Sequence, residues 1–217
     1  MSQRMHEPVR RIAICGGTFD PFHRGHLEPV LAARDQMGWD RVLYVPAHRQ
    51  PFKLEQDTAS GHHRFAMAVL ATADHDDVWV TSWELERDRT SYSVDTLEHL
   101  RAEFPVASLD WLIGDDNLAD LEAWKSLDRI FELANFVVLT RGGANAPVAL
   151  ASRIAAAGSQ PPHGAIVFAH TAAVPVSSTE IRRRVAEDLP IDALVDPRVS
   201  RYIHHYGLYR PSTKGVL

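Results

Sequence analysis

Short, mostly apolar runs alternate with amphipathic stretches along most of the chain. These runs occupy residues 12–15, 41–46, 78–81, 109–114, 135–141 and 165–169, and they lack the polar alternation of half-exposed strands. Leu27, Val30 and Leu31 recur at helical spacing after the first run, and the helix that they predict ends near Gly38. The pattern predicts an α/β fold: a single Rossmann-like, doubly wound domain with a mostly parallel central sheet and a C-terminal helical region.

We expect the 217 residues to form one domain, because strands and helices alternate from end to end. Residues 1–10 are expected to be a flexible tail. Residues 143–164 are rich in Ala, Gly and Pro around a short helical piece at 148–156, which indicates a surface insertion. Residues 177–209 are expected to form the C-terminal helical subregion. At the start of an amphipathic helix at 62–73, His63 and Arg64 are interpreted as capping or surface ion-pair residues.

Composition and charge narrow the possible functions. Hydrophobic residues at 45% and charged residues at 24% are ordinary for a soluble protein, and a net charge of -5 gives no reason to expect nucleic acid or an anionic membrane as partner. The single cysteine, Cys15, lies in a predicted buried strand and cannot form an intramolecular disulfide, so a cytoplasmic location is expected. No run approaches the ~20 apolar residues of a membrane span, and residues 1–11 lack the apolar core of a signal peptide.

The first apolar run leads into a glycine turn, residues 16–22, and then into the start of a helix. Gly16 and Gly17 are expected to make the turn tight, because glycine adopts a positive φ without steric cost. The helix start that follows offers unpaired amides and the positive end of a dipole, which suits a phosphate. The turn has neither the Lys-Ser/Thr ending of a P-loop nor the GxGxxG of a dinucleotide fold. Neither of those phosphate motifs therefore explains the turn.

Two histidines follow this turn. His23 and His26 stand three residues apart at the helix start, so both imidazoles can point into the same space. A metal-ligand pair is one alternative, although no third Cys or His lies at ligand spacing nearby. Two solvated surface histidines are the other alternative.

The segment from Gly16 to His26, Gly-Gly-Thr-Phe-Asp-Pro-Phe-His-Arg-Gly-His, resembles the (H/T)xGH signature of a nucleotidyltransferase superfamily, in the version of bacterial nicotinate-nucleotide adenylyltransferases. Further motifs of that family are matched at 91–96, 113–116 and 176–182, and the resemblance runs from about residue 11 to residue 209. The superfamily also includes pantetheine-phosphate adenylyltransferases and cytidylyltransferases. Ser-Tyr-Ser-Val-Asp-Thr at 91–96, together with Trp124 at a matched spacing from Gly114, favours the pyridine nucleotide branch.

This resemblance implies an ATP site with two catalytic histidines. His23 and His26 are expected to bond the ATP phosphates and the charge that develops at the α-phosphorus. Ser178, Thr179 and Arg182, at a predicted helix start, are expected to hold the β- and γ-phosphates. The other expected ATP-binding residues are Gly16, Gly17, Thr18, Phe19, Gly114, Asp116 and Arg141.

The resemblance also implies a site for a pyridine mononucleotide. Lys53 is expected to contact the mononucleotide phosphate, Ser93 to lie beside the nicotinate, and Trp124 to stack on the pyridine ring. Phe52 departs from the family, which usually has a histidine there, and Asp120 could disfavour a carboxylated pyridine if it pointed inward. Nicotinamide mononucleotide therefore stays open as a substrate beside nicotinate mononucleotide.

The implied reaction is adenylyl transfer from ATP to nicotinate mononucleotide in NAD biosynthesis, which gives nicotinate adenine dinucleotide and pyrophosphate. Magnesium (Mg2+) is the expected cofactor, bound through phosphates and water, and no metal site made of protein ligands is predicted. A nucleotide-binding regulator without transferase activity is the alternative from another class. The oligomeric state stays open, with a homodimer as one option.

Overall fold

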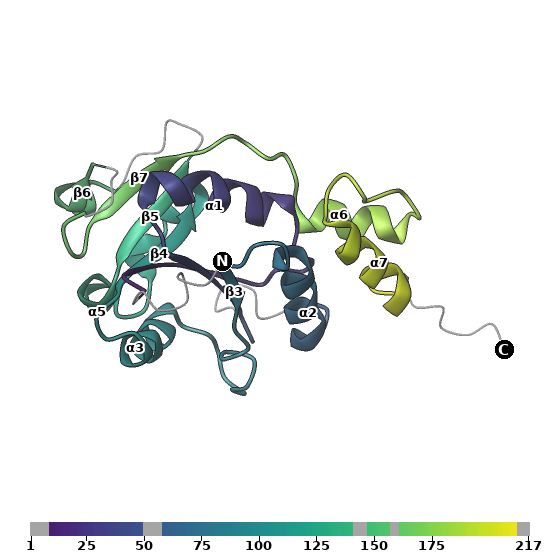
Figure 1. Ribbon diagram of the computed structural model, residues 1–217, viewed down its shortest axis with the longest axis horizontal. Helices are drawn as coiled ribbons and strands as arrows, with labels where there is room; N and C mark the ends of the chain where they lie inside the picture. Colours follow the sequence, from purple (N-terminus) through teal and green to yellow (C-terminus); the bar gives the residue numbers. More distant parts are fainter. Residues whose placement is uncertain (1–8, 50–57, 141–146, 157–160, 212–217) are drawn as a thin grey trace, which may run out of the picture.

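A parallel β-sheet runs through the centre of the computed structural model, which describes residues 9–49, 58–140, 147–156 and 161–211 (Figure 1). Within these residues the sheet has seven strands in the order β3-β2-β1-β4-β5-β7-β6, and every neighbouring pair is parallel. The strands are β1 (Arg11–Gly17), β2 (Arg41–Pro46), β3 (Val78–Val80), β4 (Ser108–Gly114), β5 (Asn135–Thr140), β6 (Ile154–Ala155) and β7 (Ile166–His170).

The direction in which the chain adds strands reverses between β1 and β4. Ile12 of β1 pairs with Arg41 of β2 on one side and with Leu109 of β4 on the other. In open parallel sheets such a switch point leaves a crevice outside the carboxyl ends of the two strands. Here those ends are Gly17 and Gly114, which the sequence analysis places in the nucleotide site.

Helices cover both faces of the sheet, with α1 above it and α3 and α5 below it in Figure 1, and α6 and α7 lie at the right-hand end of the molecule. The α-helices are α1 (Arg24–Met37), α2 (Gly61–Thr72), α3 (Ser93–Glu103), α4 (Asp115–Leu118), α5 (Leu127–Leu133), α6 (Ser178–Ala186) and α7 (Pro197–Tyr206). Two short 3-10 helices are η1 (Leu121–Ala123) and η2 (Val148–Arg153). The predicted doubly wound α/β architecture is confirmed, and the sheet is entirely parallel.

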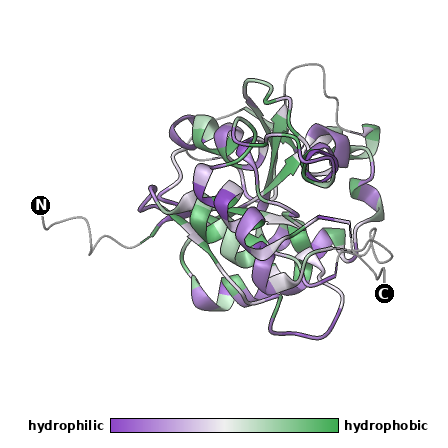
Figure 2. Ribbon diagram, turned by 90° about the vertical axis from the view of Figure 1, so that its right-hand side faces the viewer, coloured by the Kyte–Doolittle hydropathy of each residue, from purple (hydrophilic) through white to green (hydrophobic). Residues whose placement is uncertain are grey.

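Alternate residues of the central strand enter opposite cores. In β1, Ala13 and Cys15 belong to the core shared with α1, α2, α6 and α7, while Ile12 and Ile14 belong to the core shared with α3, α4 and α5. In Figure 2, hydrophobic residues run along the strands, and the helices change between hydrophobic and hydrophilic along their length. This double burial explains why the strand sequences lack polar alternation.

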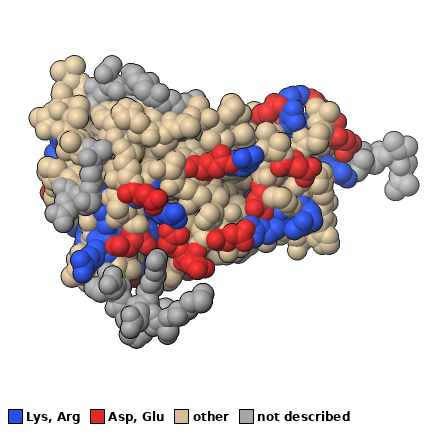
Figure 3. Space-filling model, turned by 45° about the horizontal axis from the view of Figure 1, so that its top comes forward, with Lys and Arg blue, Asp and Glu red and all other residues tan. Residues whose placement is uncertain are grey.

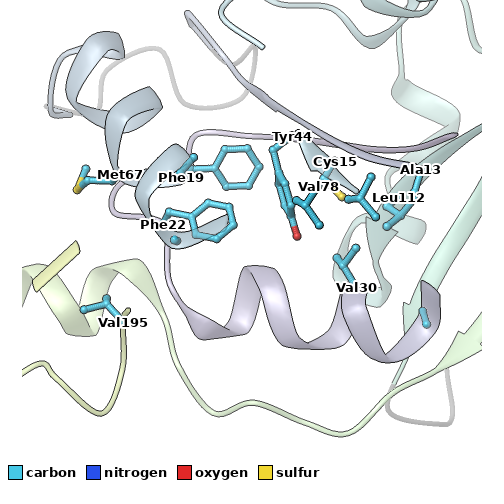
Figure 4. Close-up of a cluster of buried hydrophobic side chains, with 14 of the residues drawn as sticks. Ala13, Cys15, Phe19, Phe22, Val30, Tyr44, Met67, Val78, Leu112 and Val195 are labelled. Carbon is cyan, nitrogen blue, oxygen red and sulfur yellow. The ribbon is translucent and has the colours of Figure 1, made fainter. Parts of the chain in front are cut away.

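Aromatic rings anchor the glycine turn in the first core (Figure 4). The ring of Tyr44, on β2, lies 5.6 Å from that of Phe19 and 4.9 Å from that of Phe22, measured between ring centroids. Both contacts are edge-to-face, the arrangement that aromatic quadrupoles favour. The turn is therefore held by the core beneath it as well as by its own backbone.

The structure has one strand more than the sequence predicts. Residues 148–156, expected to be a short helical piece of the surface insertion, form η2 and then β6, which pairs with β7 through Ile154 and Ile166. The helical prediction is wrong for 154 and 155, because a strand of two residues is too short to show a period in the sequence.

Candidate active site

A cleft of about 850 Å³ lies at the switch point between β1 and β4. It brings together residues from distant parts of the chain, at the glycine turn and at the first residues of α3, α4 and α6. The predicted site residues that line it are Gly16, Gly17, Thr18, Phe19, His26, Ser93, Gly114, Asp116, Trp124, Ser178, Thr179 and Arg182.

Three predicted site residues are not among these lining residues. His23 lies behind His26 and is 6% exposed. Lys53 and Arg141 lie outside the described residues, so their expected contacts with phosphate and nucleotide stay predictions.

The glycine turn changes direction at Phe19 and not at its glycines. Gly16 and Gly17 end β1 and are not among the described residues with positive φ, whereas Phe19 has φ 54°. Gly16 is needed for space, because a Cβ there would lie 2.7 Å from Cζ2 of Trp111. The prediction that Gly16 and Gly17 adopt a positive φ is wrong. The positive φ of Phe19 costs on the order of 1–3 kcal/mol of conformational free energy.

The two histidines stack at the start of α1. Their ring centroids are 3.6 Å apart and their planes 17° from parallel, and His23 is the N-cap residue. The backbone N–H of His23 donates to Nδ1 of His26 at 3.3 Å, and this bond helps to cap the helix. Because Nδ1 of His26 accepts, the neutral ring carries its proton on Nε2, so it can act as a hydrogen-bond donor there.

His23 is held in the neutral form by its surroundings. Burial lowers its pKa to about 4, since an imidazolium ion would lose its hydration there. Its Nδ1 is buried and has no hydrogen-bond partner among the described residues. A buried polar atom without a partner costs free energy, which a bound ligand or water would recover.

The start of α6 faces the glycine turn directly. Ser177 caps the helix through its hydroxyl oxygen, which accepts from the N–H of Glu180 at 3.2 Å. Ser178 Oγ donates to the carbonyl of Pro21 at 3.0 Å, and Arg182 Nη1 donates to the carbonyl of Asp20 at 2.7 Å. These bonds bring two motifs that stand about 160 residues apart in the sequence together in one cleft.

Arg64 also holds the glycine turn, which the sequence analysis missed. Its guanidinium is buried and donates to the carbonyls of Thr18, Ala47 and Ala59 at 2.6, 2.8 and 3.0 Å. The expected capping or surface ion-pair role is therefore wrong for Arg64. His63 lies at the helix start, where its Nδ1 is 2.9 Å from the hydroxyl of Tyr202.

An aromatic and polar surface forms the opposite side of the cleft. Ser93 is the first residue of α3, where the backbone amides and the positive end of the helix dipole face the cleft. Trp124 packs edge-to-face on Trp111 and Phe136, with centroid separations of 6.5 and 5.7 Å. Asp120 is exposed and does not line the cleft, so its carboxylate does not oppose a negatively charged ligand there.

Glu84 is a second residue that the sequence analysis missed. It lines the cleft beneath the start of α3, is 5% exposed, and accepts a hydrogen bond from the Thr96 hydroxyl. Burial raises the pKa of the Glu84 carboxyl, while hydrogen bonds from Ser91 and Thr96 oppose that rise. Glu84 follows a three-residue strand in a run of mixed charge, so nothing in the sequence marks it as buried.

The described residues contain no group of three His, Cys, Asp or Glu side chains that could hold a metal ion. Charged side chains of both signs are intermixed on the face drawn in Figure 3. In the described part of the chain, no helix is both long and apolar enough to span a bilayer.

Comparison with known proteins identifies the family to which this chain belongs. Residues 14–184 match the family model described as "Cytidylyltransferase-like", so the chain belongs to that family of nucleotidyltransferases. The chain is 38% identical over 210 residues to the "Probable nicotinate-nucleotide adenylyltransferase" of Chromobacterium violaceum. This alignment covers 92% of this chain and 99% of the relative. A protein with the same description from Pseudoalteromonas atlantica is 37% identical over 211 residues, with 93% and 96% covered. Within the wider family, the chain is a member of the nicotinate-nucleotide adenylyltransferases.

Solved structures of low sequence identity share the fold. The "Plasmodium falciparum nicotinic acid mononucleotide adenylyltransferase complexed with NaAD" superposes with a TM-score of 0.71 at 19% identity and covers 92% of this chain and 97% of its own. A "Putative Nicotinate-nucleotide Adenylyltransferase from Vibrio parahaemolyticus" has a TM-score of 0.66 at 19% identity, with 94% and 98% covered. These likenesses confirm the Rossmann-like architecture.

Proposed function

We propose that the cleft holds ATP and nicotinate mononucleotide side by side and joins them into nicotinate adenine dinucleotide, with release of pyrophosphate. The observation that carries this proposal is that one cleft has two different halves. The ATP half consists of the glycine turn, His26 with His23 behind it, and the start of α6. The pyridine half consists of Glu84, the start of α3 and Trp124.

The reaction requires the protein to align the two substrates and does not require a nucleophilic side chain. An oxygen of the mononucleotide phosphate forms a bond to the α-phosphorus of ATP, while the bond from that phosphorus to the bridging oxygen of the β-phosphate breaks. The electron pair of that bond leaves with pyrophosphate. The protein has to bring two polyanions together and to stabilise charge on the transferring group, which are positioning and electrostatic tasks.

The ATP half offers donors of the kind that this charge needs. The Nε2–H of His26 can donate to an oxygen on the α-phosphorus, and His23 holds the His26 ring through stacking and through its backbone N–H. Thr179 and Arg182, with the amides at the start of α6, are placed to hold the β- and γ-phosphates.

The pyridine half favours a carboxylated ring over its amide. The first amides of α3, at Ser93, carry a partial positive charge that attracts the nicotinate carboxylate. Trp124 offers a ring face for stacking on the pyridine. Glu84 accepts a hydrogen bond from Thr96 in the first turn of α3, and Asp120 does not line the cleft.

Magnesium fits this site as a companion of ATP. The cleft offers single carboxylates, such as Asp116, and no group of three metal ligands among the described residues. A hard cation that keeps most of its water would bind mainly to the triphosphate and, when bound, screens the charge of the leaving pyrophosphate. The cytoplasmic location and the oligomeric state stay predictions.

Pyrophosphate release tests the proposal directly. The protein is incubated with ATP, magnesium and, in parallel, nicotinate mononucleotide, nicotinamide mononucleotide or 4'-phosphopantetheine. We expect release with the first substrate, a dinucleotide of matching mass, and a clear preference over the amide. Preference for the amide would contradict the assignment of the α3 start as a carboxylate site, and no release with any substrate would contradict adenylyl transfer.

A further inference from the structure

The C-terminal segment reaches back to the glycine turn. Tyr209, three residues after the end of α7, donates a hydrogen bond from its hydroxyl to Oδ1 of Asp20 at 2.6 Å. Helices α6 and α7 lie side by side at one end of the molecule, and the N–H of Arg24, at the start of α1, donates to the carbonyl of Leu194 between them at 3.1 Å (Figure 1). These bonds tie the C-terminal subregion to the ATP half, in addition to the bonds of Ser178 and Arg182 to the glycine turn.

Asp20 has an unusual place for a carboxylate, since it lines a cleft that binds polyanions. It is 3% exposed, its Oδ1 also accepts from the N–H of Ala59 at 3.3 Å, and its Oδ2 is buried without a hydrogen-bond partner among the described residues. Burial raises the pKa of Asp20, while the Tyr209 hydroxyl and the nearby charges of Arg182 and Arg64 act against that rise. These bonds and charges favour the ionised form of a carboxylate beside the phosphate site.

We propose that Tyr209 is a positioning residue for the phosphates of ATP: its hydroxyl holds the Asp20 side chain, so that Arg182 presents its guanidinium to the cleft. Arg182 already donates to the backbone carbonyl of Asp20 at 2.7 Å. An Asp20 carboxylate released from Tyr209 could instead pair with that guanidinium, which would compete with the ATP phosphates for the same donors. The inference rests on the proposed function and adds a residue to its ATP half.

The backbone conformation near both ends of the hydrogen bond between Tyr209 and Asp20 supports a functional role for Tyr209. Phe19, next to Asp20, has φ 54°, and Tyr209 itself has φ 64°, a region that bulky side chains rarely adopt. Such residues persist where the surrounding structure holds them, and they gather at functional sites. The hydrogen bond therefore joins Tyr209, which has a positive φ, to the direct neighbour of Phe19, 189 residues away along the chain.

The substitution Tyr209→Phe removes the hydroxyl and keeps the ring. We expect kcat/KM for ATP to fall about tenfold, mainly through a higher KM for ATP, because a charged hydrogen-bond acceptor loses its donor. The KM for nicotinate mononucleotide is expected to change less than twofold, since Tyr209 lies in the ATP half. Tyr206→Phe is the matched control, because Tyr206 ends α7, is 55% exposed and lines no part of the cleft.

An unchanged KM for ATP in Tyr209→Phe, or an equal loss for both substrates, would overturn the proposal. Asp20→Asn tests the same bond from its acceptor if Tyr209→Phe does not fold. It removes the carboxylate that would compete for Arg182, so any loss for ATP is expected to stay below tenfold. The doubly substituted protein should resemble Asp20→Asn within twofold, and additive losses would show that Tyr209 does not act through Asp20. Failure of the parent protein to release pyrophosphate would instead contradict the proposed function itself.

Discussion

The two halves of the cleft are built in different ways. The glycine turn in the ATP half accepts hydrogen bonds from residues 39 to 189 positions away in the sequence, at Ala59, Ser178, Arg182 and Tyr209. In the pyridine half, Glu84 bonds Thr96 only 12 residues away, and Trp124 packs on Trp111 of β4. The ATP half therefore depends on segments from both ends of the chain, whereas Glu84 and Trp124 contact these two residues within 13 positions of themselves.

This difference predicts that substitutions in the two halves have different effects. The part of the site that must align reacting phosphates is fixed by many distant contacts, which limits its movement. The part that chooses the pyridine ring is made of short segments whose side chains can be exchanged with little effect on the rest. Changes in the ATP half should impair turnover and stability, and changes in the pyridine half should alter selectivity.

The largest expected effect is that of His26→Ala. Loss of one donor to the transferring group typically costs ~10²- to 10³-fold in rate, and we expect kcat to fall by at least that much while the protein stays folded. Steady-state pyrophosphate release measures the rate, and a thermal melt checks the fold. His204→Ala, at an exposed histidine of α7, is the control. Turnover within threefold of the parent would remove His26 from the mechanism.

His23 gives the ATP half a pH dependence of its own. Its pKa is lowered from 6.5 to about 4, so its contribution to stability is full above pH 6.5 and is lost as the pH falls toward 4. His23→Asn keeps an N-cap residue and should remove this loss, which is on the order of 3 kcal/mol. The check is urea unfolding of both proteins between pH 7 and pH 4. Equal slopes of stability against pH in the two proteins would show that His23 is not buried as described.

Arg182→Ala tests whether the start of α6 holds the triphosphate. A hydrogen bond to a charged group is worth about 1.5–3 kcal/mol, so we expect the KM for ATP to rise roughly 10- to 100-fold. Arg183→Ala, next in sequence, is the control, because Arg183 is paired with Glu180 and Glu187 on the solvent side. A similar rise in both variants would indicate a general effect of charge and not a phosphate contact.

The smallest effect, and the most selective, is expected for Trp124→Ala. Stacking of a base on an aromatic side chain is worth about 1–3 kcal/mol, so the KM for nicotinate mononucleotide should rise about tenfold while the KM for ATP changes little. Trp124→Phe should recover part of the loss, because it keeps a ring. Trp79→Ala, at a tryptophan that is 49% exposed on the sheet edge, is the control. A rise in the KM for ATP alone would contradict the assignment of Trp124 to the pyridine half.

The sequence predicts the fold and the local motifs well, because both leave short-range patterns. The buried strands carry uninterrupted apolar runs, and twelve of the predicted site residues line one cleft. Contacts between distant segments leave no such pattern. Arg64 looks like a surface residue at a helix start, yet it bonds three carbonyls of other segments. Likewise, the positive φ of Phe19 depends on the core beneath it and not on its own residue type.

Equilibrium binding to the two halves tests the central claim most directly. Titration calorimetry gives dissociation constants of a non-hydrolysable ATP analogue and of nicotinate mononucleotide, each for the parent, Arg182→Ala and Trp124→Ala. We predict a crossed result, in which Arg182→Ala weakens the ATP analogue at least tenfold and Trp124→Ala weakens the mononucleotide about tenfold, each leaving the other ligand within twofold. If each variant weakens both ligands alike, the cleft is not divided into an ATP half and a pyridine half.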